Sequence, residues 1–216
     1  MPRNVTTPML QLDPSVFGPD VPVGVGADLA NMAGDYGYLA SGYYRSLDGE
    51  LQGMRLIPTT ADALDAYVVP IAMEKARLAG LPVPAFHFTT SRFPSPPLMA
   101  YPVNPFSERG ELLVDTDAIE ARRKGLTYTG KYAVLCQELP PDYRIDVVRC
   151  VLGRTLVAEY EAFARAVFLT FRLPLARVRV IVTPRAYLLS ALMPLPLAQL
   201  TPDERALVEE LGSWRA

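Results

Sequence analysis

The chain has 216 residues, of which 50% are hydrophobic and 20% charged, an ordinary balance for a globular protein that buries a core. Its 21 basic and 23 acidic residues give a formal net charge of −2, which does not favour nucleic acid or an anionic membrane as a partner. No apolar run approaches the roughly 20 residues of a membrane span, and the first residues lack the apolar segment of a signal peptide. We therefore expect a cytoplasmic protein with no nucleic-acid or membrane partner.

The N-terminal part of the chain predicts an arm followed by a helix. Residues 1–30 contain five prolines and little periodicity, which predicts an irregular arm with one short strand near 21–25. Between residues 31 and 53, leucine and tyrosine recur at helical spacing, and Asp35 is the expected N-cap of this helix. A short strand should follow at 54–57.

A second helix is predicted over residues 59–80. Thr59 and Asp62 have the spacing of a capping box, in which each residue binds the other's backbone N–H. Pro70 lies in the middle of this helix and should kink it or split it into two, because proline removes a backbone hydrogen bond.

Residues 81–110 are unusually rich in proline, with seven in the stretch. Such a density is incompatible with a helix or a central strand, so we expect an extended inserted loop in which only 86–88 pairs briefly. A loop of this length would serve as a lid, an arm or a docking segment. Its aromatic side chains are expected to fold back onto the core, the alternative being a partner surface.

The last half of the chain predicts the central α/β core. The segment 144–190 has the pattern of a strand at 145–152, buried on both faces, then a helix from Thr155 to Phe171. Strands at 178–182 and 186–190 follow, the first with the alternation of a half-buried strand.

Shorter elements complete the prediction. Strands are expected at 111–115 and 131–139 with a helical turn at 118–124 between them, and a Thr-Pro-Asp-Glu start predicts a last helix over 201–211. The fold class is thus α/β: residues 31–216 form a single domain with a mixed sheet packed by a few helices, interrupted by the proline-rich loop 81–110.

The residues that most often build an active site form no recognisable motif here. Cys136 and Cys150 lie in apolar predicted strands, where free buried thiols are favoured over a disulfide or a reactive thiolate. His87 is the only histidine, so the common zinc patterns are excluded, and we expect it to be a structural or surface residue. No phosphate-binding glycine loop with its lysine and no nucleophile elbow is present, so we predict no catalytic residue and no metal site.

Arginines provide the candidate binding site. Arg149, Arg154, Arg177 and Arg179 come from two strands and a turn that should be neighbours, and Arg45 on the first helix could join them. Such a group would bind carboxylate or phosphate through charge-assisted hydrogen bonds. The alternative is a solvated face with ordinary ion pairs.

Two sequence blocks resemble the RimK-like ATP-grasp N-terminal domain family. The first is YGYLASGYYRSL with the following GMRLIPT, and its matching positions are Tyr36, Tyr38, Gly42, Tyr43, Tyr44, Ser46, Leu47 and Pro58. The second runs from VLGRTLVAEYEAFARAVF to the strand YLLSALMPLPL, and its matching positions are Gly153, Arg154, Leu156, Tyr160, Ala164, Phe168, Phe171, Pro174, Leu175, Arg177, Ser190 and Pro194. Tyr43 and Tyr44, beside Arg45, are thereby candidates for ligand or partner contact, although core packing is the alternative.

In that family the domain precedes an ATP-grasp body that joins a carboxylate to an amine through an acyl phosphate and uses Mg-ATP. The resemblance therefore implies a role near peptide-like or glutamate-type ligation. Only one predicted helix follows the domain here, so the expectation is that the ATP- and Mg-binding half is absent and that this chain holds no cofactor.

The leading hypothesis is a non-catalytic accessory or substrate-presenting module for a separately encoded ATP-grasp ligase, which would bind the Mg-ATP. An independent binding protein for a small acidic ligand or peptide is the alternative, and an enzyme with an unrecognised site is a third. A homo-oligomer is also left open.

Overall fold

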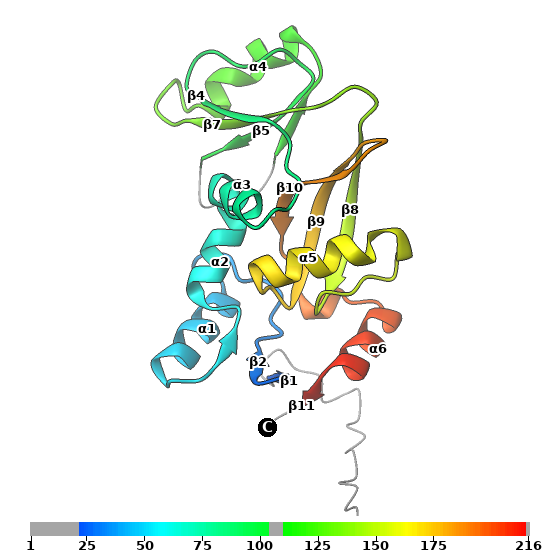
Figure 1. Ribbon diagram of the computed structural model, residues 1–216. Coiled ribbons are helices and arrows are strands. Elements are labelled where there is room, and N and C mark those ends of the chain that lie inside the picture. The colour runs from blue at the N-terminus through cyan, green and yellow to red at the C-terminus, as the bar shows by residue number, and fades with distance from the viewer. Residues whose placement is uncertain (1–21, 104–109, 215–216) are drawn as a thin grey trace, which may run out of the picture.

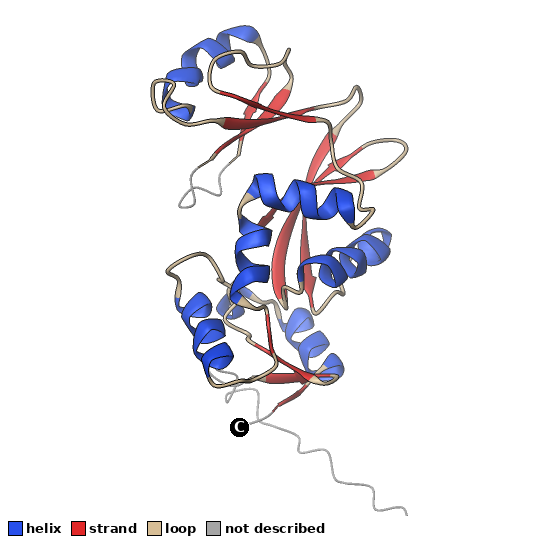
Figure 2. Cartoon of the chain, turned by 60° about the vertical axis from the view of Figure 1, so that its left-hand side comes forward, coloured by secondary structure: helices blue, strands red, loops and turns tan. Residues whose placement is uncertain are grey.

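The computed structural model describes residues 22–103 and 110–214, and these form three sheets with six α-helices beside them. The sheets follow one another along the long direction of the molecule, as Figure 1 shows in labelled form and Figure 2 by the colour of the strands. We call them the terminal, central and upper sheets. The predicted α/β class is confirmed, with three sheets where one mixed sheet was expected.

The terminal sheet joins the two ends of the described chain. Its strand order is β11 (Ser213–Trp214), β1 (Val23–Val25), β2 (Asp28–Ala30) and β3 (Leu56–Ile57). Most pairs are antiparallel, whereas β2 and β3 are parallel, so this sheet is mixed. The short strands predicted near 21–25 and 54–57 are present. Residues 1–21 of the expected irregular arm lie outside the described residues, and its last part differs from the prediction because it forms β1 and β2.

The first helix is shorter than predicted. Helix α1 (Ser41–Leu51) begins after Ala40, which makes no side-chain cap. Asp35 was expected to cap it, but it lies six residues before the first helical residue, and its side chain accepts a hydrogen bond from the Gly37 N–H instead. The packing of α1 needs a glycine at position 42, because a Cβ there would lie 2.1 Å from the Asp35 carbonyl oxygen. The backbone at Asp35 thus lies directly against α1 at this glycine.

The second predicted helix is split as expected. Helix α2 (Thr60–Tyr67) starts with the complete Thr59–Asp62 capping box, and α3 (Val69–Leu78) follows directly. Pro70 lies in the first turn of α3, where its missing N–H costs no intrahelical hydrogen bond.

The upper sheet takes two of its strands, β4 (Phe86–Thr89) and β5 (Leu98–Pro102), from the stretch predicted to be an inserted loop. Its strand order is β4, β7 (Val134–Glu138), β5 and β6 (Glu111–Leu113), all antiparallel, with α4 (Thr116–Leu126) packed against it. The prediction that 81–110 contains no central strand is wrong, because β5 lies between β7 and β6. Pro97 precedes β5 and Pro102 is its last residue, so no proline interrupts the four buried residues between them.

The central sheet consists of β10 (Tyr187–Met193), β9 (Leu175–Val182) and β8 (Arg144–Val151), in that order and antiparallel. One face is covered by α2, α3 and α5 (Glu161–Phe171), and these helices and the sheet together supply most of the largest core cluster. β8 was predicted to be buried on both faces, but it is an edge strand whose first four residues are exposed or half-buried.

The helix predicted from Thr155 starts later than expected. A short 3-10 helix, η2 (Ala158–Tyr160), precedes α5, and Leu156 and Val157 are exposed instead of contributing to the core stripe. The last predicted helix is confirmed as α6 (Pro202–Leu211) with its complete Thr201–Glu204 capping box, after a second 3-10 helix, η3 (Leu197–Gln199).

Candidate functional site

Three of the predicted arginines lie on one face of the central sheet. Arg149 of β8 is directly opposite Arg177 of β9, and Arg179 is opposite Val147. Residues directly opposite each other share a face of a sheet, so Arg149, Arg177 and Arg179 form one group, which we call the arginine face. Like charges placed opposite each other repel, and each guanidinium therefore needs a partner.

The partners of these arginines differ in charge. Arg149 binds both carboxylate oxygens of Glu204, through Nε at 2.6 Å and Nη2 at 2.7 Å. Arg177 donates from Nε to the Pro194 carbonyl oxygen at 2.7 Å, and Arg179 donates from Nη1 to the Tyr101 hydroxyl at 2.9 Å. Within the described residues, the charge of Arg149 is compensated, whereas Arg177 and Arg179 bind neutral oxygens. Positive charge therefore concentrates on β9.

Glu204 is held in its ionised form by this arrangement. Burial would raise the pKa of its carboxyl group, but hydrogen bonds from Arg149 and from the Thr201 backbone and side chain outweigh it and keep the pKa below its ordinary value. The sequence places Glu204 there because it is the third residue of α6, where the capping box needs a carboxylate. One side chain thus starts a helix and compensates a strand arginine.

The structure does not bring Arg154 or Arg45 to the arginine face. Arg154 lies in the turn after β8 and forms an ion pair with Glu161, the first residue of α5. Arg45 is on α1 and lines a different cavity. The five arginines thus lie in three places, and ligand binding by any of them stays a prediction.

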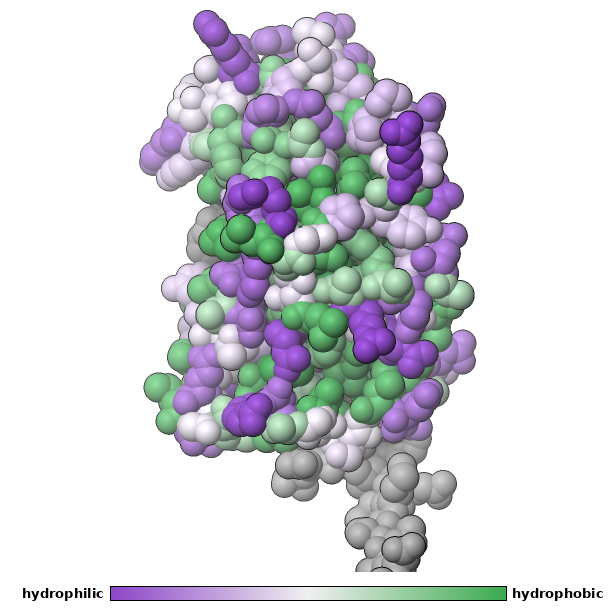
Figure 3. All heavy atoms as spheres, viewed as in Figure 1, coloured by the Kyte–Doolittle hydropathy of each residue, from purple (hydrophilic) through white to green (hydrophobic). Residues whose placement is uncertain are grey.

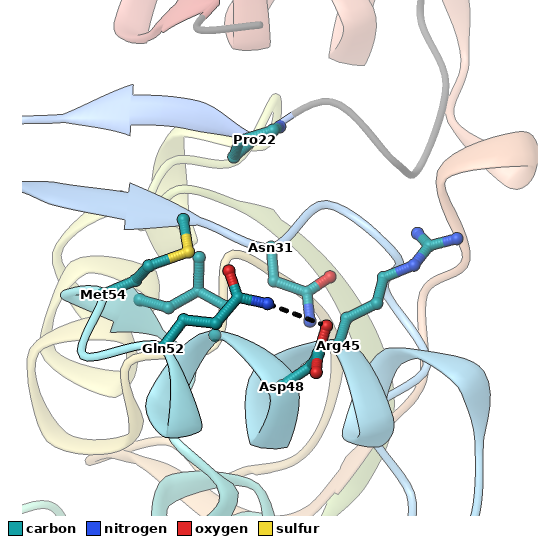
Figure 4. A pocket seen from close by; sticks show the side chains of 8 residues that line it. Pro22, Asn31, Arg45, Asp48, Gln52 and Met54 are labelled. Carbon is teal, nitrogen blue, oxygen red and sulfur yellow. Dashed lines mark hydrogen bonds between the residues drawn. The ribbon is translucent and has the colours of Figure 1, made fainter.

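The cavity beside α1 has a volume of about 270 Å³ and combines one basic and one acidic side chain. Figure 4 shows that Gln52 donates to Asp48, at 3.1 Å, while the guanidinium of Arg45 is turned away from this pair. Asn31 also lines the cavity and is fixed by donating to the Gly42 carbonyl at 2.7 Å. Figure 4 also shows Pro22 and Met54 at its border.

Comparison with known proteins finds a family match for part of the chain. The family model described as "RimK-like ATPgrasp N-terminal domain" matches residues 132–211. Over these residues the chain is similar to that domain. The match contains the arginine face and Arg154 and confirms the resemblance of the second sequence block. The first block, with Tyr43, Tyr44 and Arg45, lies outside it.

Solved structures share the ATP-grasp fold at low identity. A RimK domain protein ATP-grasp from Sphaerobacter thermophilus is 16% identical, with a TM-score of 0.57, over 77% of this chain and 72% of its own. D-alanine–D-alanine ligase from Bacillus anthracis complexed with ATP is 13% identical, with a TM-score of 0.58, over 82% and 72%. ATP-grasp ligase PsnB, complexed with a phosphomimetic variant of its minimal precursor, Mg and ADP, is 17% identical, with a TM-score of 0.51, over 79% and 66%.

These likenesses show the fold and leave the activity open. The D-alanine–D-alanine ligase from Coxiella burnetii is covered over only 59% of its length. No curated protein sequence matches the chain. Each of these four alignments covers more than half of the other protein's chain.

Sequence reasoning missed a hydrogen-bond chain that links the central sheet to the upper sheet. Arg179 donates to the Tyr101 hydroxyl, which lies 2.8 Å from Ser190 Oγ, and Ser190 donates to Gln137 Oε1 at 2.6 Å. Gln137 in turn donates to the Ser190 carbonyl at 2.8 Å. Tyr101, Ser190 and Gln137 are buried, so each polar group finds its partner within the chain. The sequence signal that could have indicated this chain is one polar residue inside each of two apolar strands, Gln137 in β7 and Ser190 in β10.

The tyrosines of the first block divide between core and surface. Tyr43 is half-buried against the largest core cluster and meets Tyr38 edge to face at 5.5 Å. Tyr44 is exposed and lies, with Arg45 and Leu51, at a second shallow cavity of about 340 Å³. Of the two candidates Tyr43 and Tyr44, Tyr44 is therefore the one positioned for contact with a ligand or partner.

The two cysteines and the histidine lie as the sequence predicted. Cys136 and Cys150 are free and buried, and burial raises the pKa of both thiols to about 12. His87 is exposed on β4 and lies 2.6 Å from Glu138. In the part of the chain that the structure describes, no three His, Cys, Asp or Glu residues gather as metal ligands, and no helix is long and apolar enough to cross a membrane.

Proposed function

We propose that the chain is a non-catalytic accessory or substrate-presenting module for a separately encoded ATP-grasp ligase that joins a carboxylate to an amine. The ATP-grasp fold and the family match over residues 132–211 support this link to ligation. Mg-ATP would then be bound and used by the partner ligase.

The observation that carries this proposal is that the polar side chains between the upper and central sheets are hydrogen-bonded to one another. Arg179, Tyr101, Ser190 and Gln137 bind one another in one continuous chain. Arg149 is likewise held by Glu204. These groups stabilise the fold, and a nucleotide could recruit them only by breaking buried hydrogen bonds, each worth about 1 kcal/mol net.

Presentation of a carboxylate substrate suits the charges that remain. Arg177 and Arg179 lie two residues apart on one face of β9 and bind only neutral oxygens among the described residues. A carboxylate placed between them would form charge-assisted hydrogen bonds, which are about twice as strong as neutral ones.

The test is to purify the tagged chain from its own host and to identify co-purifying proteins by mass spectrometry. We expect an ATP-grasp ligase whose ligation rate rises when the chain is added. Arg177→Gln should reduce that gain, while Arg185→Gln, at an exposed turn position, should leave it unchanged. Saturable ATP hydrolysis by the isolated chain that is lost in Arg177→Gln would contradict the proposal.

A second candidate is an independent binding protein for a small acidic ligand, which Arg177 and Arg179 also favour because they bind only neutral oxygens among the described residues. It predicts that glutamate, citrate or a glutamyl dipeptide raises the melting temperature with no protein partner present. The rise should disappear in Arg177→Gln and persist in Arg185→Gln. Equal rises in both variants would contradict this candidate.

A further inference from the structure

Within residues 22–103 and 110–214, one edge of the central sheet carries no neighbouring strand. β8 pairs with β9 along its whole length, and on its other side the described residues provide only a bridge between Val151 and Arg154, at its very end. Figure 1 shows β8 as the outermost strand of this sheet. Alternate backbone N–H and C=O groups between residues 144 and 150 therefore point away from the sheet.

Edges of this kind are usually short or blocked, and β8 is neither. It has eight residues, above the usual five to six, with no proline and no irregularity in its register with β9. The opposite edge of the sheet differs: β10 contains a register shift near Ser190, and the Leu189 N–H donates to the Pro82 carbonyl. The open edge is thus specific to β8.

A groove of about 620 Å³ runs along this edge. One wall is formed by residues 145–149 and the other by the segment 155–157 before η2. Three apolar side chains in it are about half exposed: Val147 at 52%, Leu156 at 52% and Val157 at 48%. On the face drawn in Figure 3, hydrophobic and hydrophilic residues alternate. We call this feature the edge groove.

Charged groups in the edge groove are mostly acidic. Asp146, Glu159 and Glu204 line it together with one cation, Arg149. The Tyr160 hydroxyl donates to Asp146, and Arg144, just outside the lining, pairs with Asp146 at 2.8 Å. Glu159 is 3.8 Å from Arg144, a looser pair that leaves its carboxylate open to a further cation.

We propose that the edge groove binds an extended peptide that adds a strand to β8. A row of backbone donors and acceptors, repeating every ~6.8 Å, is complementary to another extended backbone and to few other ligands. The five residues 145–149 would pair with about five peptide residues, one apolar side chain resting on Val147, Leu156 and Val157. A basic residue next to it would meet Glu159. This inference stands on the edge and the groove and does not depend on the link to a ligase.

The experiment starts from a displayed library of random peptides of about 12 residues, panned on the full chain and depleted on the Val147→Glu variant. The best binder is synthesised, and its affinity is measured for the wild type and for two variants. Val147→Glu should weaken binding by about ten-fold or more, and Val114→Glu, a valine of similar exposure (55%) after β6, should leave it unchanged. Thermal unfolding of both variants checks that they fold.

N-methylation of the peptide backbone then separates strand addition from side-chain contact alone. Two peptides, methylated at alternate residues in the two opposite registers, should differ at least about ten-fold in affinity, because only one edge of the peptide pairs with β8. Amide exchange should slow at alternating residues of β8. Equal affinities of the two methylated peptides would overturn the proposal. So would a library that yields no peptide binding the wild type more tightly than Val147→Glu. A dimer in sedimentation whose β8 amides are protected without peptide would also overturn it, because a second copy would then cover the edge.

Discussion

Replacing Glu204 with glutamine tests whether the Arg149 pair stabilises the fold. Glu204 is 5% exposed and Arg149 33%, so the variant leaves a partly buried guanidinium without a counter-charge. The glutamine amide oxygen can still accept from the Thr201 N–H, so the capping box is largely retained. The substitution therefore removes mainly the charge.

The expected loss is about 2–3 kcal/mol in the free energy of unfolding. Losing one partner of a fully buried ion pair costs roughly 3–5 kcal/mol, and water can reach part of Arg149, which lowers the figure. With a urea slope of about 2–3 kcal/mol per M, the unfolding midpoint should fall by ~1 M at pH 7. Glu209→Gln, an exposed position on the same helix, should change it by less than about 0.5 kcal/mol.

The pH dependence gives the sharper check. Because the pKa of Glu204 is lowered in the folded chain, its contribution is fully present above the ordinary glutamate pKa of about 4.3 and is lost as pH falls through the lowered value. Urea titrations from pH 7 to pH 3 should therefore show wild type and Glu204→Gln converging in acid. A gap that is absent at pH 7, or that persists unchanged in acid, would refute the reasoning.

Two further predictions concern backbone and thiols. Gly34→Ala should destabilise the chain by at least about 2 kcal/mol, because φ is +74° there and a Cβ would lie 2.0 Å from the Leu195 carbonyl oxygen. Gly125→Ala, on α4 with open space around the added Cβ, should stabilise the chain by up to about 1 kcal/mol. Equal urea midpoints for the two variants would contradict this. Cys136 and Cys150 should resist a disulfide reagent at pH 8 and react after unfolding, because burial raises both thiol pKa values to about 12. Rapid labelling of the native chain would show that the thiols are accessible.

Features that depend on neighbours in the sequence were predictable. The Thr59 and Thr201 capping boxes and the break at Pro70 involve residues within one turn of each other, and all three are present. Their hydrogen bonds form whatever the rest of the chain does, so a short pattern is sufficient to identify them.

Features that depend on strand pairing were not predictable. The apolar run of β8 fits a strand buried on both faces equally well as an edge strand, because periodicity does not report what lies beside it. β5 was missed because the prolines around it were counted by density and not by position. Position matters, since a proline at the end of a strand breaks no ladder inside it.

The candidate site shows the same limit. The three arginines of one sheet face could be grouped from the sequence only by assuming a register between β8 and β9, and that register brings Arg149 opposite Arg177. Nothing in the sequence indicated that Arg154 would pair with Glu161 or that Tyr101 would reach Ser190 from another sheet. Their partners come from elements whose packing is set by the whole core.

Glu204 also separates the two kinds of binding proposed for this chain. It lies in the edge groove and compensates Arg149 on the arginine face, so glutamine there makes both regions more positive. Attraction of an acidic ligand to Arg177 should then increase, while a basic peptide in the edge groove should bind less tightly. Affinities of Glu204→Gln measured for a glutamyl dipeptide and for the selected peptide should therefore move in opposite directions. Affinities that fall together would show that the substitution acts through the fold, and unchanged affinities would place both ligands elsewhere.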